Sequence, residues 1–343
     1  MLEPASKKSG LAHNNQSRAP PKRFLLTGGS GFIGKAACLA FLSLGNSIKL
    51  TLRSTSGTSI PLGCGSMVFE DIRAKTNWSA ALKGVDCVIH LAARAHVMTE
   101  TKADPLAAYR EVNVAGTHRL AEQAAASGVR RLVFLSSIGV NGTFTDGPSS
   151  FAAQDVPCPT ENYAISKWEA EQALWEVSAK TGLEVAVIRS PLVYGPGVKG
   201  NMLRLLQWAA RGVPLPLGAV NNARSLIGLD NLVDLLIRCV NHPAAAGQTL
   251  LVSDGQDLST PELIRTLAHS MKKPARLLPV PVPLLRAAGS LVGKRAEVDR
   301  LVGSLRVDSS HTRALLGWTP PVSVEAGLKK MADWYLQNKN QNS

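Results

Sequence analysis

Two short motifs in this chain contain residues that could carry out redox chemistry on an alcohol or a ketone. Tyr163 and Lys167 stand four residues apart, and a glycine run extends from Gly28 to Gly34. Residues four apart share one face of a helix, so the Lys167 ammonium would favour the ionised form of the phenol, whose usual pKa is about 10. Either motif alone is weak evidence of catalysis, and most tyrosine–lysine pairs at this spacing are exposed neighbours on a helix surface. Together they predict proton and hydride transfer.

The composition is that of an ordinary globular protein. The chain has 343 residues, and its hydrophobic content of 45% can fill one large domain or two modest ones. Its five cysteines are scattered without metal-ligand spacing, which favours a reducing compartment and no metal site. Residues 1–21 are polar and lack the apolar segment of a secretory signal. We therefore expect a cytoplasmic protein with a disordered N-terminal tail.

The positive charge of the chain is concentrated at its two ends. The formal net charge is +13. Residues 1–23 hold five basic and one acidic residue, and residues 260–343 hold thirteen basic and six acidic residues. Such a surface attracts nucleic acid, anionic lipid or a phosphorylated small molecule, although most basic faces are simply solvated. No nucleic-acid motif accompanies it and aromatic residues make up only 5% of the chain, so we expect no nucleic-acid partner.

One apolar stretch, Leu277 to Val292, raises the question of a membrane contact. Three prolines and Arg286 interrupt it, and it is shorter than the roughly 20 residues that a spanning helix needs. From Leu284 onward it could form a short helix that packs on the core or lies against a membrane surface beside Lys294 and Arg295. We expect core packing, because buried short helices are common. The alternative places the protein peripherally at the inner face of the membrane.

Short apolar runs alternate with segments of helical periodicity over residues 23–190. Strands are predicted at Arg23–Thr27, Ser47–Leu52, Met67–Phe69, Cys87–Leu91, Arg131–Ser136 and Glu184–Arg189. Helices are predicted at Phe32–Leu44, Trp78–Leu82, Pro105–Ala126 and Glu161–Lys180. This alternation is typical of an α/β fold, a Rossmann-like, doubly wound parallel sheet that binds its ligand at the carboxyl ends of the strands.

The regular alternation ends near Pro191, and a smaller, mixed C-terminal substrate lobe is predicted to follow. Its expected helices are Asn201–Arg211, Leu229–Cys239 and Pro261–Ser270, and its expected strands are Thr249–Ser253 and Ala275–Leu278. The domain division is then a basic tail at 1–22, an NAD(P)-binding domain at 23–190, a substrate-binding lobe at 191–337 and a frayed tail at 338–343.

The glycine run is suited to a dinucleotide. Gly29-Ser30-Gly31-Phe32-Ile33-Gly34 satisfies Gly-x-Gly-x-x-Gly, and it follows a predicted strand and opens a predicted helix. The glycines permit a tight turn and let a pyrophosphate approach the N–H groups of the helix N-terminus.

The segments after the next strands bear on the choice of cofactor. Such folds place a carboxylate on the ribose after the second strand, or a basic residue where a 2′-phosphate must be held. Arg53 stands there, so NADP(H) is favoured, and NAD(H) is the alternative. Asp71 follows the third strand, where it can accept from the adenine amino group. The small side chains of Ala92 and Ala93 suit a backbone beside the cofactor.

In their order and spacing these motifs resemble one family, the extended short-chain dehydrogenase/reductases, and within it the NAD-dependent epimerase/dehydratase branch that acts on nucleotide sugars. The resemblance covers residues 23 to about 335. The matching segments are the glycine run, Asp71-Ile72, His90-Leu91-Ala92-Ala93, Asn113-Val114-Ala115-Gly116-Thr117, Ser136-Ser137, Tyr163 with Lys167, and Arg189-Ser190-Pro191-Leu192-Val193-Tyr194-Gly195-Pro196.

The resemblance implies roles for these residues. Tyr163 would be the general acid/base on the substrate oxygen, Lys167 would hold the nicotinamide ribose, and Ser137 would hydrogen-bond the substrate oxygen. Ser136 is the less suitable serine, and its hydroxyl is expected to bond to neighbouring backbone. Asn113 is expected to support the site. The implied cofactor contacts are Gly28, Gly31, Phe32, Ile33, Gly34, Arg53, Asp71, Ile72, Leu91, Ala92, Ala93, Tyr163, Lys167 and Pro191.

Substrate contacts are also implied. Asn201 stands where the branch often places an amide on the sugar or its diphosphate, and Arg224 resembles the arginine that grips the diphosphate. A second diphosphate arginine is expected before Val307, and Arg295 and Arg300 both qualify. His96 could reach a sugar hydroxyl, although a loop histidine is more often a surface residue.

Departures from the family's pattern narrow the reaction. Ile138 and Gly139 occupy the places of the acidic pair of 4,6-dehydratases, so dehydration is not expected. Asn141 replaces the tyrosine typical of 4-epimerases, and Arg53 replaces the carboxylate that retains NAD tightly. Both differences favour a releasable NADP and a net reduction.

The leading hypothesis is a 4-ketoreductase, similar to those that make UDP-deoxy-aminosugars for surface polysaccharide. It would deliver hydride from NAD(P)H to C4 of a UDP-4-keto-6-deoxy-hexosamine while Tyr163 donates a proton. The alternative is a 4-epimerase of a UDP-sugar or a polyprenyl-diphosphate sugar. A third hypothesis is a regulator that senses NAD(P) without catalysis. The expected partner of the enzyme is a nucleotide-diphosphate sugar, and we expect a homodimer.

Overall fold

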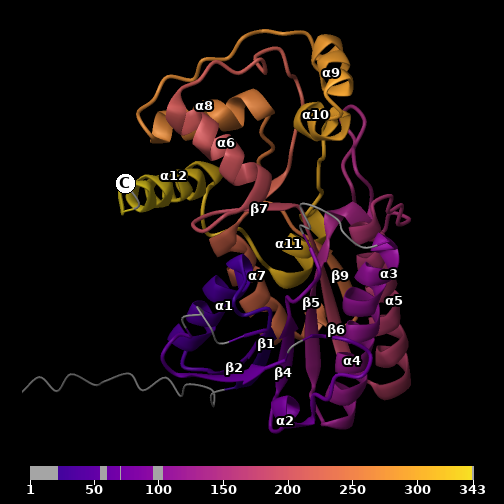
Figure 1. The fold of residues 1–343 in the computed structure, drawn as a ribbon. Coiled ribbons are helices and arrows are strands. Elements are labelled where there is room, and N and C mark those ends of the chain that lie inside the picture. The colour runs from indigo at the N-terminus through magenta and orange to yellow at the C-terminus, as the bar shows by residue number, and fades with distance from the viewer. Residues whose placement is uncertain (1–21, 55–59, 70, 96–102, 342–343) are drawn as a thin grey trace, which may run out of the picture.

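The first part of the chain alternates strands with helices, as the apolar pattern predicts (Figure 1). The structure, a computed structural model, describes residues 22–54, 60–69, 71–95 and 103–341. The strands here are β1 (Arg23–Thr27), β2 (Ser47–Leu52), β3 (Cys64–Val68), β4 (Cys87–His90), β5 (Arg131–Ser137) and β6 (Glu184–Ser190). The helices are α1 (Phe32–Ser43), α2 (Ser79–Leu82), α3 (Pro105–Tyr109), η1 (Arg110–Ala115), α4 (Gly116–Ala126), η2 (Ile138–Val140) and α5 (Asn162–Thr181).

The strands of the large sheet all run parallel, in the order β3-β2-β1-β4-β5-β6-β9. The seventh strand, β9 (Gln248–Leu251), comes from the later part of the chain. The strand order reverses between β1 and β4, which pair with each other. Doubly wound sheets bind ligands at this switch point, outside the carboxyl ends of the strands. The predicted Rossmann-like fold is confirmed, and the glycine run after β1 lies at the switch point.

Apolar helices cover both faces of the sheet, because parallel strands are buried on both sides. On one face, α1 and α7 (Leu229–Asn241) pack against the strands through residues such as Phe41 and Leu232. On the other face, α2, α4 and α5 contribute Trp78, Leu120 and Leu174. Residues 229–252, although they lie well beyond residue 190, therefore pack with the large sheet.

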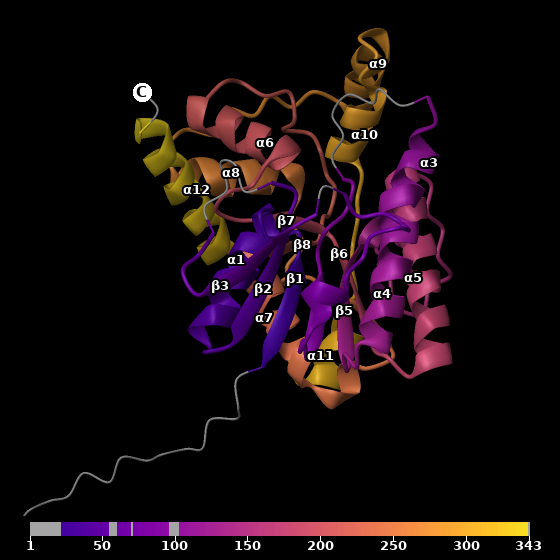
Figure 2. The same ribbon diagram turned by 60° about the horizontal axis from the view of Figure 1, so that its bottom comes forward.

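Most of the chain after β6 forms a smaller, mainly helical lobe (Figure 1 and Figure 2). Its core is built from α6, α8 and α12, and Phe32 at the start of α1 packs against it. The remaining elements are β7 (Leu192–Tyr194), α6 (Gly200–Arg211), β8 (Leu226–Gly228), η3 (Pro243–Ala245), α8 (Thr260–Ser270), α9 (Val282–Leu291), α10 (Arg295–Val302), α11 (Ser310–Leu316) and α12 (Val324–Gln341). β7 and β8 pair as a separate parallel sheet.

One sequence expectation for the smaller lobe is wrong, and a second holds only in part. Residues 275–278 form no strand, and only an isolated bridge joins Leu277 to Leu215. The prolines on both sides of Leu277 lack the N–H groups that would extend this bridge into a ladder. The helix expected near Leu284 forms as α9, but only Gly289 in it is buried.

α9 packs with one face against α10, and the pair projects from the molecule in both views (Figure 1 and Figure 2). Leu284 is 60% exposed and Leu291 is 88% exposed, so the expected core packing of this segment applies to one helix face only. Among the described residues, no helix is both long and apolar enough to cross a membrane.

Candidate active site

The glycine turn after β1 leaves room for a phosphate beside backbone N–H groups. Gly28 has φ +73°, and a Cβ there would lie 2.8 Å from a backbone nitrogen of the segment after β4. A Cβ on Gly34 would lie 2.1 Å from the Gly28 carbonyl oxygen. Gly31 caps α1, which begins with Phe32 and Ile33 and has no acidic residue in its first turn. These residues fit the pyrophosphate of a dinucleotide.

The residues predicted at the adenosine end of the cofactor lie after β2 and β3. Arg53 is exposed, and among the contacts of the described residues none engages its guanidinium. Asp71 accepts from the Ile72 N–H at 2.9 Å and from Arg73 Nε at 2.6 Å. Ile72 packs against α4, where a Cβ on Gly116 would lie 2.6 Å from it. Asp71 is therefore held by its neighbours, whereas Arg53 can turn toward a ligand.

A series of buried hydrogen bonds holds the end of β4 in place. The Thr27 hydroxyl lies 2.6 Å from His90 Nδ1, and the Thr117 hydroxyl lies 2.9 Å from His90 Nε2. Burial, helped by a nearby lysine, lowers the pKa of His90 to about 3, so its ring is neutral. The Ala92 N–H donates to the Thr27 hydroxyl at 3.1 Å. These hydrogen bonds hold the segment Leu91 to Ala93 close to the glycine turn.

The two serines at the end of β5 have different environments. Ser137 is half-buried and accepts from the Gly139 N–H at 3.1 Å. A Cβ on Gly139 would lie 3.2 Å from the Ala164 Cβ in the first turn of α5, so the Ser137 turn abuts that helix. Ser136 is buried and donates to Glu171. The expectation that backbone satisfies Ser136 is therefore wrong, because a buried carboxylate does so.

Tyr163 lies in the first turn of α5 and is partly exposed. Its ring contacts Tyr109 edge-on, with 6.2 Å between the ring centroids. Desolvation by the surrounding protein atoms, and to a smaller extent the electrostatic influence of Tyr109, raises the pKa of the Tyr163 phenol to about 12. The sequence predicts that Lys167 favours the ionised form, but in this structure burial dominates. The Tyr163 phenol is thus neutral near pH 7.

Lys167 points into the sheet. Its ammonium lies 3.9 Å from the centroid of the Phe134 ring, and the residue is 1% exposed. Burial lowers the pKa of Lys167 to about 7, and Glu171 counters part of that shift. The charge on Lys167 near neutral pH therefore depends on what binds beside it. Pro191, another predicted cofactor contact, is buried directly after β6.

A buried ion pair supports the site one turn beyond Lys167. Glu171 on α5 and Arg189 on β6 lie 2.7 Å apart, with side chains 0% and 3% exposed. Arg189 also donates from Nη1 to Asn141 Oδ1 at 3.0 Å, and Glu171 accepts from Ser136. Buried charges persist only when they are paired and hydrogen-bonded. Sequence reasoning missed Glu171, although its spacing of four residues from Lys167 was a usable signal.

Asn113 lies in a π-helical turn that interrupts the predicted helix over residues 105–126. The helix forms as α3, η1 and α4, with η1 of the π type, and such turns often occur at functional sites. Asn113 accepts from the Arg94 N–H at 2.8 Å and donates to Ser166 Oγ at 2.9 Å. It therefore ties the segment after β4 to α5, in the supporting position that the sequence suggests.

The predicted substrate contacts are spread over the smaller lobe. Asn201 is exposed in the first turn of α6. Arg224 is half-buried and donates from Nη1 to the carbonyl oxygens of Arg300 at 2.7 Å and Gly303 at 3.1 Å. Burial lowers the pKa of Arg224. His96 lies outside the described residues.

The two candidates for the second diphosphate arginine lie on α10 and have different partners. Arg295 pairs with Asp299 on the same helix at 2.9 Å. Arg300 pairs at 2.6 Å with Glu161, the residue that precedes α5. Arg300 therefore reaches the beginning of the helix that carries Tyr163, whereas the Arg295 guanidinium is held by Asp299 of α10 and by Ser290 of α9.

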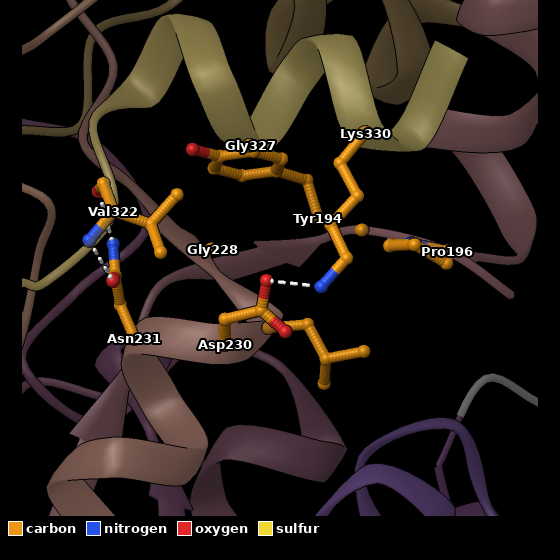
Figure 3. Close-up of a pocket in the computed structure, with 10 residues that line it drawn as sticks. Tyr194, Pro196, Gly228, Asp230, Asn231, Val322, Gly327 and Lys330 are labelled. Atoms are coloured by element: carbon orange, nitrogen blue, oxygen red, sulfur yellow. Dashed lines mark hydrogen bonds and ion pairs between the residues drawn. The ribbon is translucent and has the colours of Figure 1, made fainter. Parts of the chain in front are cut away.

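A small cavity lies where β7, α7 and α12 meet, and Figure 3 shows the residues around it. Its volume of about 10 Å³ is close to the minimum for one water molecule. Lys330 pairs with Asp230 at 2.6 Å, and Asn231 exchanges two hydrogen bonds with Val322. None of the predicted catalytic residues lines this cavity. We therefore interpret it as a small gap left where these elements pack together. The described part of the chain also contains no cluster of His, Cys, Asp or Glu that could hold a metal.

The comparisons with known proteins agree on one family. A model of the NAD dependent epimerase/dehydratase family matches residues 24–252. A UDP-glucose 4-epimerase from Vibrio cholerae is 44% identical over 328 residues, which cover 94% of this chain and 98% of that protein. An N-acetyl-alpha-D-glucosaminyl-diphospho-ditrans,octacis-undecaprenol 4-epimerase from Escherichia coli O157:H7 is 26% identical over 76% of this chain and 80% of the relative.

A solved structure extends the likeness to the fold. MoeE5 in complex with UDP-glucose and NAD matches with a TM-score of 0.74 and 24% sequence identity. The match covers 92% of this chain and 99% of that one. At this identity the similarity supports the shared architecture, in which the large sheet and the smaller lobe occur together.

Proposed function

The chain belongs to the NAD dependent epimerase/dehydratase family, and from this premise we propose that it interconverts an alcohol and a ketone at C4 of a UDP-sugar. It is an NAD(P)-dependent enzyme, so the hypothesis of a non-catalytic regulator is set aside. The observation that carries the proposal is the similarity to a UDP-glucose 4-epimerase over nearly the full length of both chains. The candidate site also supports the proposal, because a serine, a tyrosine and a lysine lie around the carboxyl ends of the strands.

Tyr163 is proposed to move the proton. As a neutral phenol it can donate to the C4 oxygen of a ketone, and the half-buried Ser137 hydroxyl can hydrogen-bond the same oxygen. A bound nicotinamide would supply or accept the hydride at C4. In the oxidising direction Tyr163 must accept the hydroxyl proton, which requires a lower pKa, and Lys167 is the chain's own cation on the same helix face.

The cofactor is proposed to lie across the glycine turn, with Lys167 and the segment Leu91 to Ala93 on the nicotinamide side. The exposed Arg53 guanidinium supports NADP, because it can pair with a 2′-phosphate. The similar MoeE5 protein, in contrast, was solved in complex with NAD. We expect Arg53→Ala to weaken NADPH binding by about tenfold or more, as loss of a charge-assisted hydrogen bond does, while NADH binding is kept. An unchanged ratio of the two dissociation constants would reject NADP preference.

Epimerisation at C4 is the reaction that the relatives support best. Two of them, including the 44% identical one, are named as 4-epimerases. The presence of Asn141 in place of the tyrosine typical of 4-epimerases is also weaker evidence against epimerisation than the sequence suggests. The Asn141 side chain is 3% exposed and bonds to Arg189 and the Ala152 carbonyl oxygen, so it acts as a structural residue here. We therefore place 4-epimerisation first, ahead of the keto-reduction that the sequence favours.

Net keto-reduction at C4 is the second candidate, because the residue that follows β2 favours it. Arg53 stands where a carboxylate would help to retain NAD, and an enzyme that consumes its cofactor must release it. The substrate would then be a UDP-4-keto-6-deoxy-hexosamine.

The stoichiometry of the cofactor separates the two reactions. An epimerase converts UDP-glucose or UDP-N-acetylglucosamine into its C4 epimer without added reductant and without net change in absorbance at the NAD(P)H band. A reductase leaves those sugars unchanged and consumes one NAD(P)H for each 4-keto sugar. Failure of both assays with a range of UDP-sugars would reject the proposed function. The carrier named for the Escherichia coli relative makes a polyprenyl-diphosphate sugar a further substrate for the same assay.

A further inference from the structure

α9 has an apolar stripe on its outer face. Its exposed residues recur at helical spacing, which places them along one side of the helix. They are Leu284, Ala287, Ala288 and Leu291, and the stripe is continued by Val292, which is 69% exposed. The inner face packs on α10, since a Cβ on Gly289 would lie 2.7 Å from the Val298 side chain. The stripe is therefore additional to the face that α9 needs for folding.

The segment that contains α9 is strongly basic. Residues 263–296 contain no aspartate or glutamate. The seven basic residues in it are Arg265, Lys272, Lys273, Arg276, Arg286, Lys294 and Arg295. Arg286 and Arg295 share a single carboxylate, that of Asp299, each at 2.9 Å. Arg286, Lys294 and Arg295 lie on α9, directly after it or at the start of α10 at the projecting tip, whereas the other four lie on α8 and in the long connection that leads to α9 (Figure 1).

We propose that α9 docks this enzyme on a membrane surface that contains anionic lipid. An interfacial helix inserts its apolar face at the boundary of headgroups and acyl chains, and basic residues beside it attract anionic headgroups. The Leu284 to Val292 stripe would enter that boundary, with Lys294 and its basic neighbours at headgroup level. Because the helix is short, binding is reversible and depends on both contributions.

A second copy of the chain fits this surface less well. A ten-residue helix is about 15 Å long, so one of its faces covers far less than the roughly 800 Å² per partner of a stable interface. Pairing two copies through α9 would also bring two basic segments together, and like charges repel. An anionic membrane complements both the apolar stripe and the charge.

The docked tip would lie close to the candidate site. α9 packs on α10, and Arg300 of α10 pairs with Glu161 at the start of the helix that carries Tyr163. Docking would therefore keep α10 and the start of α5 near the headgroups. This inference does not depend on which reaction the enzyme catalyses.

Vesicle co-sedimentation of the full chain tests the proposal. We expect binding to vesicles of phosphatidylcholine with phosphatidylglycerol, weak binding to phosphatidylcholine alone, and release at high salt. The double variant Leu284→Glu/Leu291→Glu should bind at least about tenfold more weakly, because it places charge in the apolar stripe. Leu62→Glu is the matched control, since Leu62 is 100% exposed far from α9 in the sequence. Lys294→Gln, directly after the stripe, should reduce both binding and its salt dependence.

Several outcomes would overturn the proposal. They are no binding to either vesicle, equal binding to neutral vesicles, and binding that survives Leu284→Glu/Leu291→Glu. The last result would assign the membrane contact to another basic segment, such as residues 1–23. A change of molar mass in the double variant with unchanged vesicle binding would identify the stripe as a contact between copies. Thermal melting and NAD(P)H binding of every variant confirm that folding is intact.

Discussion

The two sides of the candidate site are built differently. On the side of the large sheet, Lys167, Glu171 and Arg189 are 1%, 0% and 3% exposed, and Glu171 pairs with Arg189. On the side of the smaller lobe, Asn201 is exposed, and Arg300 forms an ion pair whose side chains are about half exposed. Buried charges tolerate few replacements, whereas exposed charges tolerate many. We infer that the sheet side determines the chemistry and the lobe side selects the sugar.

The largest effect is expected from breaking the buried pair. Glu171→Gln keeps the shape of the side chain but leaves the Arg189 charge buried without a counter-ion, so the free energy of unfolding should fall by about 3 kcal/mol or more. Glu169→Gln is the matched control on the same helix, because its pair with Arg110 is partly exposed, with side chains 30% and 49% exposed, and should contribute at most about 1 kcal/mol. Urea denaturation measures both. Equal losses of unfolding free energy in the two variants would show that the buried pair contributes no more to stability than the pair on the helix surface.

The next largest effect concerns turnover. Tyr163→Phe removes the proposed proton donor, so kcat should fall by about a hundredfold or more, while NAD(P)H binding measured by fluorescence is kept. Tyr335→Phe, on the partly exposed side of α12, is the matched control and should leave kcat unchanged. If Tyr163→Phe retains its turnover, another group supplies the proton.

A smaller effect is expected on the lobe side. Arg300→Gln should raise KM for the UDP-sugar by about tenfold with little change in kcat, because a charge-assisted contact to the diphosphate is lost. Arg295→Gln should change neither constant, since its guanidinium is held by Asp299 of α10 and Ser290 of α9. The opposite pattern would identify Arg295 as the diphosphate contact. A large fall in kcat for either variant would show that the lobe side takes part in the chemistry.

The last effect is a pH dependence of stability caused by Lys167. The pKa of this lysine is about 7 in the folded protein and 10.5 when unperturbed. Between these values the unfolded chain binds one more proton, so raising the pH favours the folded state. The melting temperature of the wild type should therefore rise, relative to that of Lys167→Met, between pH 7 and pH 10. Parallel profiles would mean that Lys167 is not desolvated.

The predictable parts of the site are those with a local signal. The glycine turn can be located from Gly28 to Gly34 alone, because close backbone approach and a positive φ admit only glycine there. The strands of the large sheet follow from short apolar runs. The place of Ser137 in its motif distinguishes it from Ser136, and the different environments of the two hydroxyls are consistent with that choice.

The parts that sequence reasoning missed depend on contacts between distant segments. The pairing of Glu171 with Arg189 joins residues 18 apart, and nothing in either segment reveals the partner. The burial that raises the Tyr163 pKa arises from packing, which helical spacing does not report. The apolar residues of α9 have the same composition whether they face the core or solvent, so the exposure of Leu284 could not be predicted.

The most direct test of the proposed chemistry follows the hydrogen atom on C4 of the sugar. UDP-glucose and UDP-N-acetylglucosamine that carry deuterium at C4 are incubated with the enzyme and its cofactor, and the products are analysed by NMR. Because the hydrogen leaves and returns as hydride without exchange with water, we predict the C4 epimer with deuterium still at C4. Inversion at another carbon, or loss of the deuterium to solvent, would contradict the account.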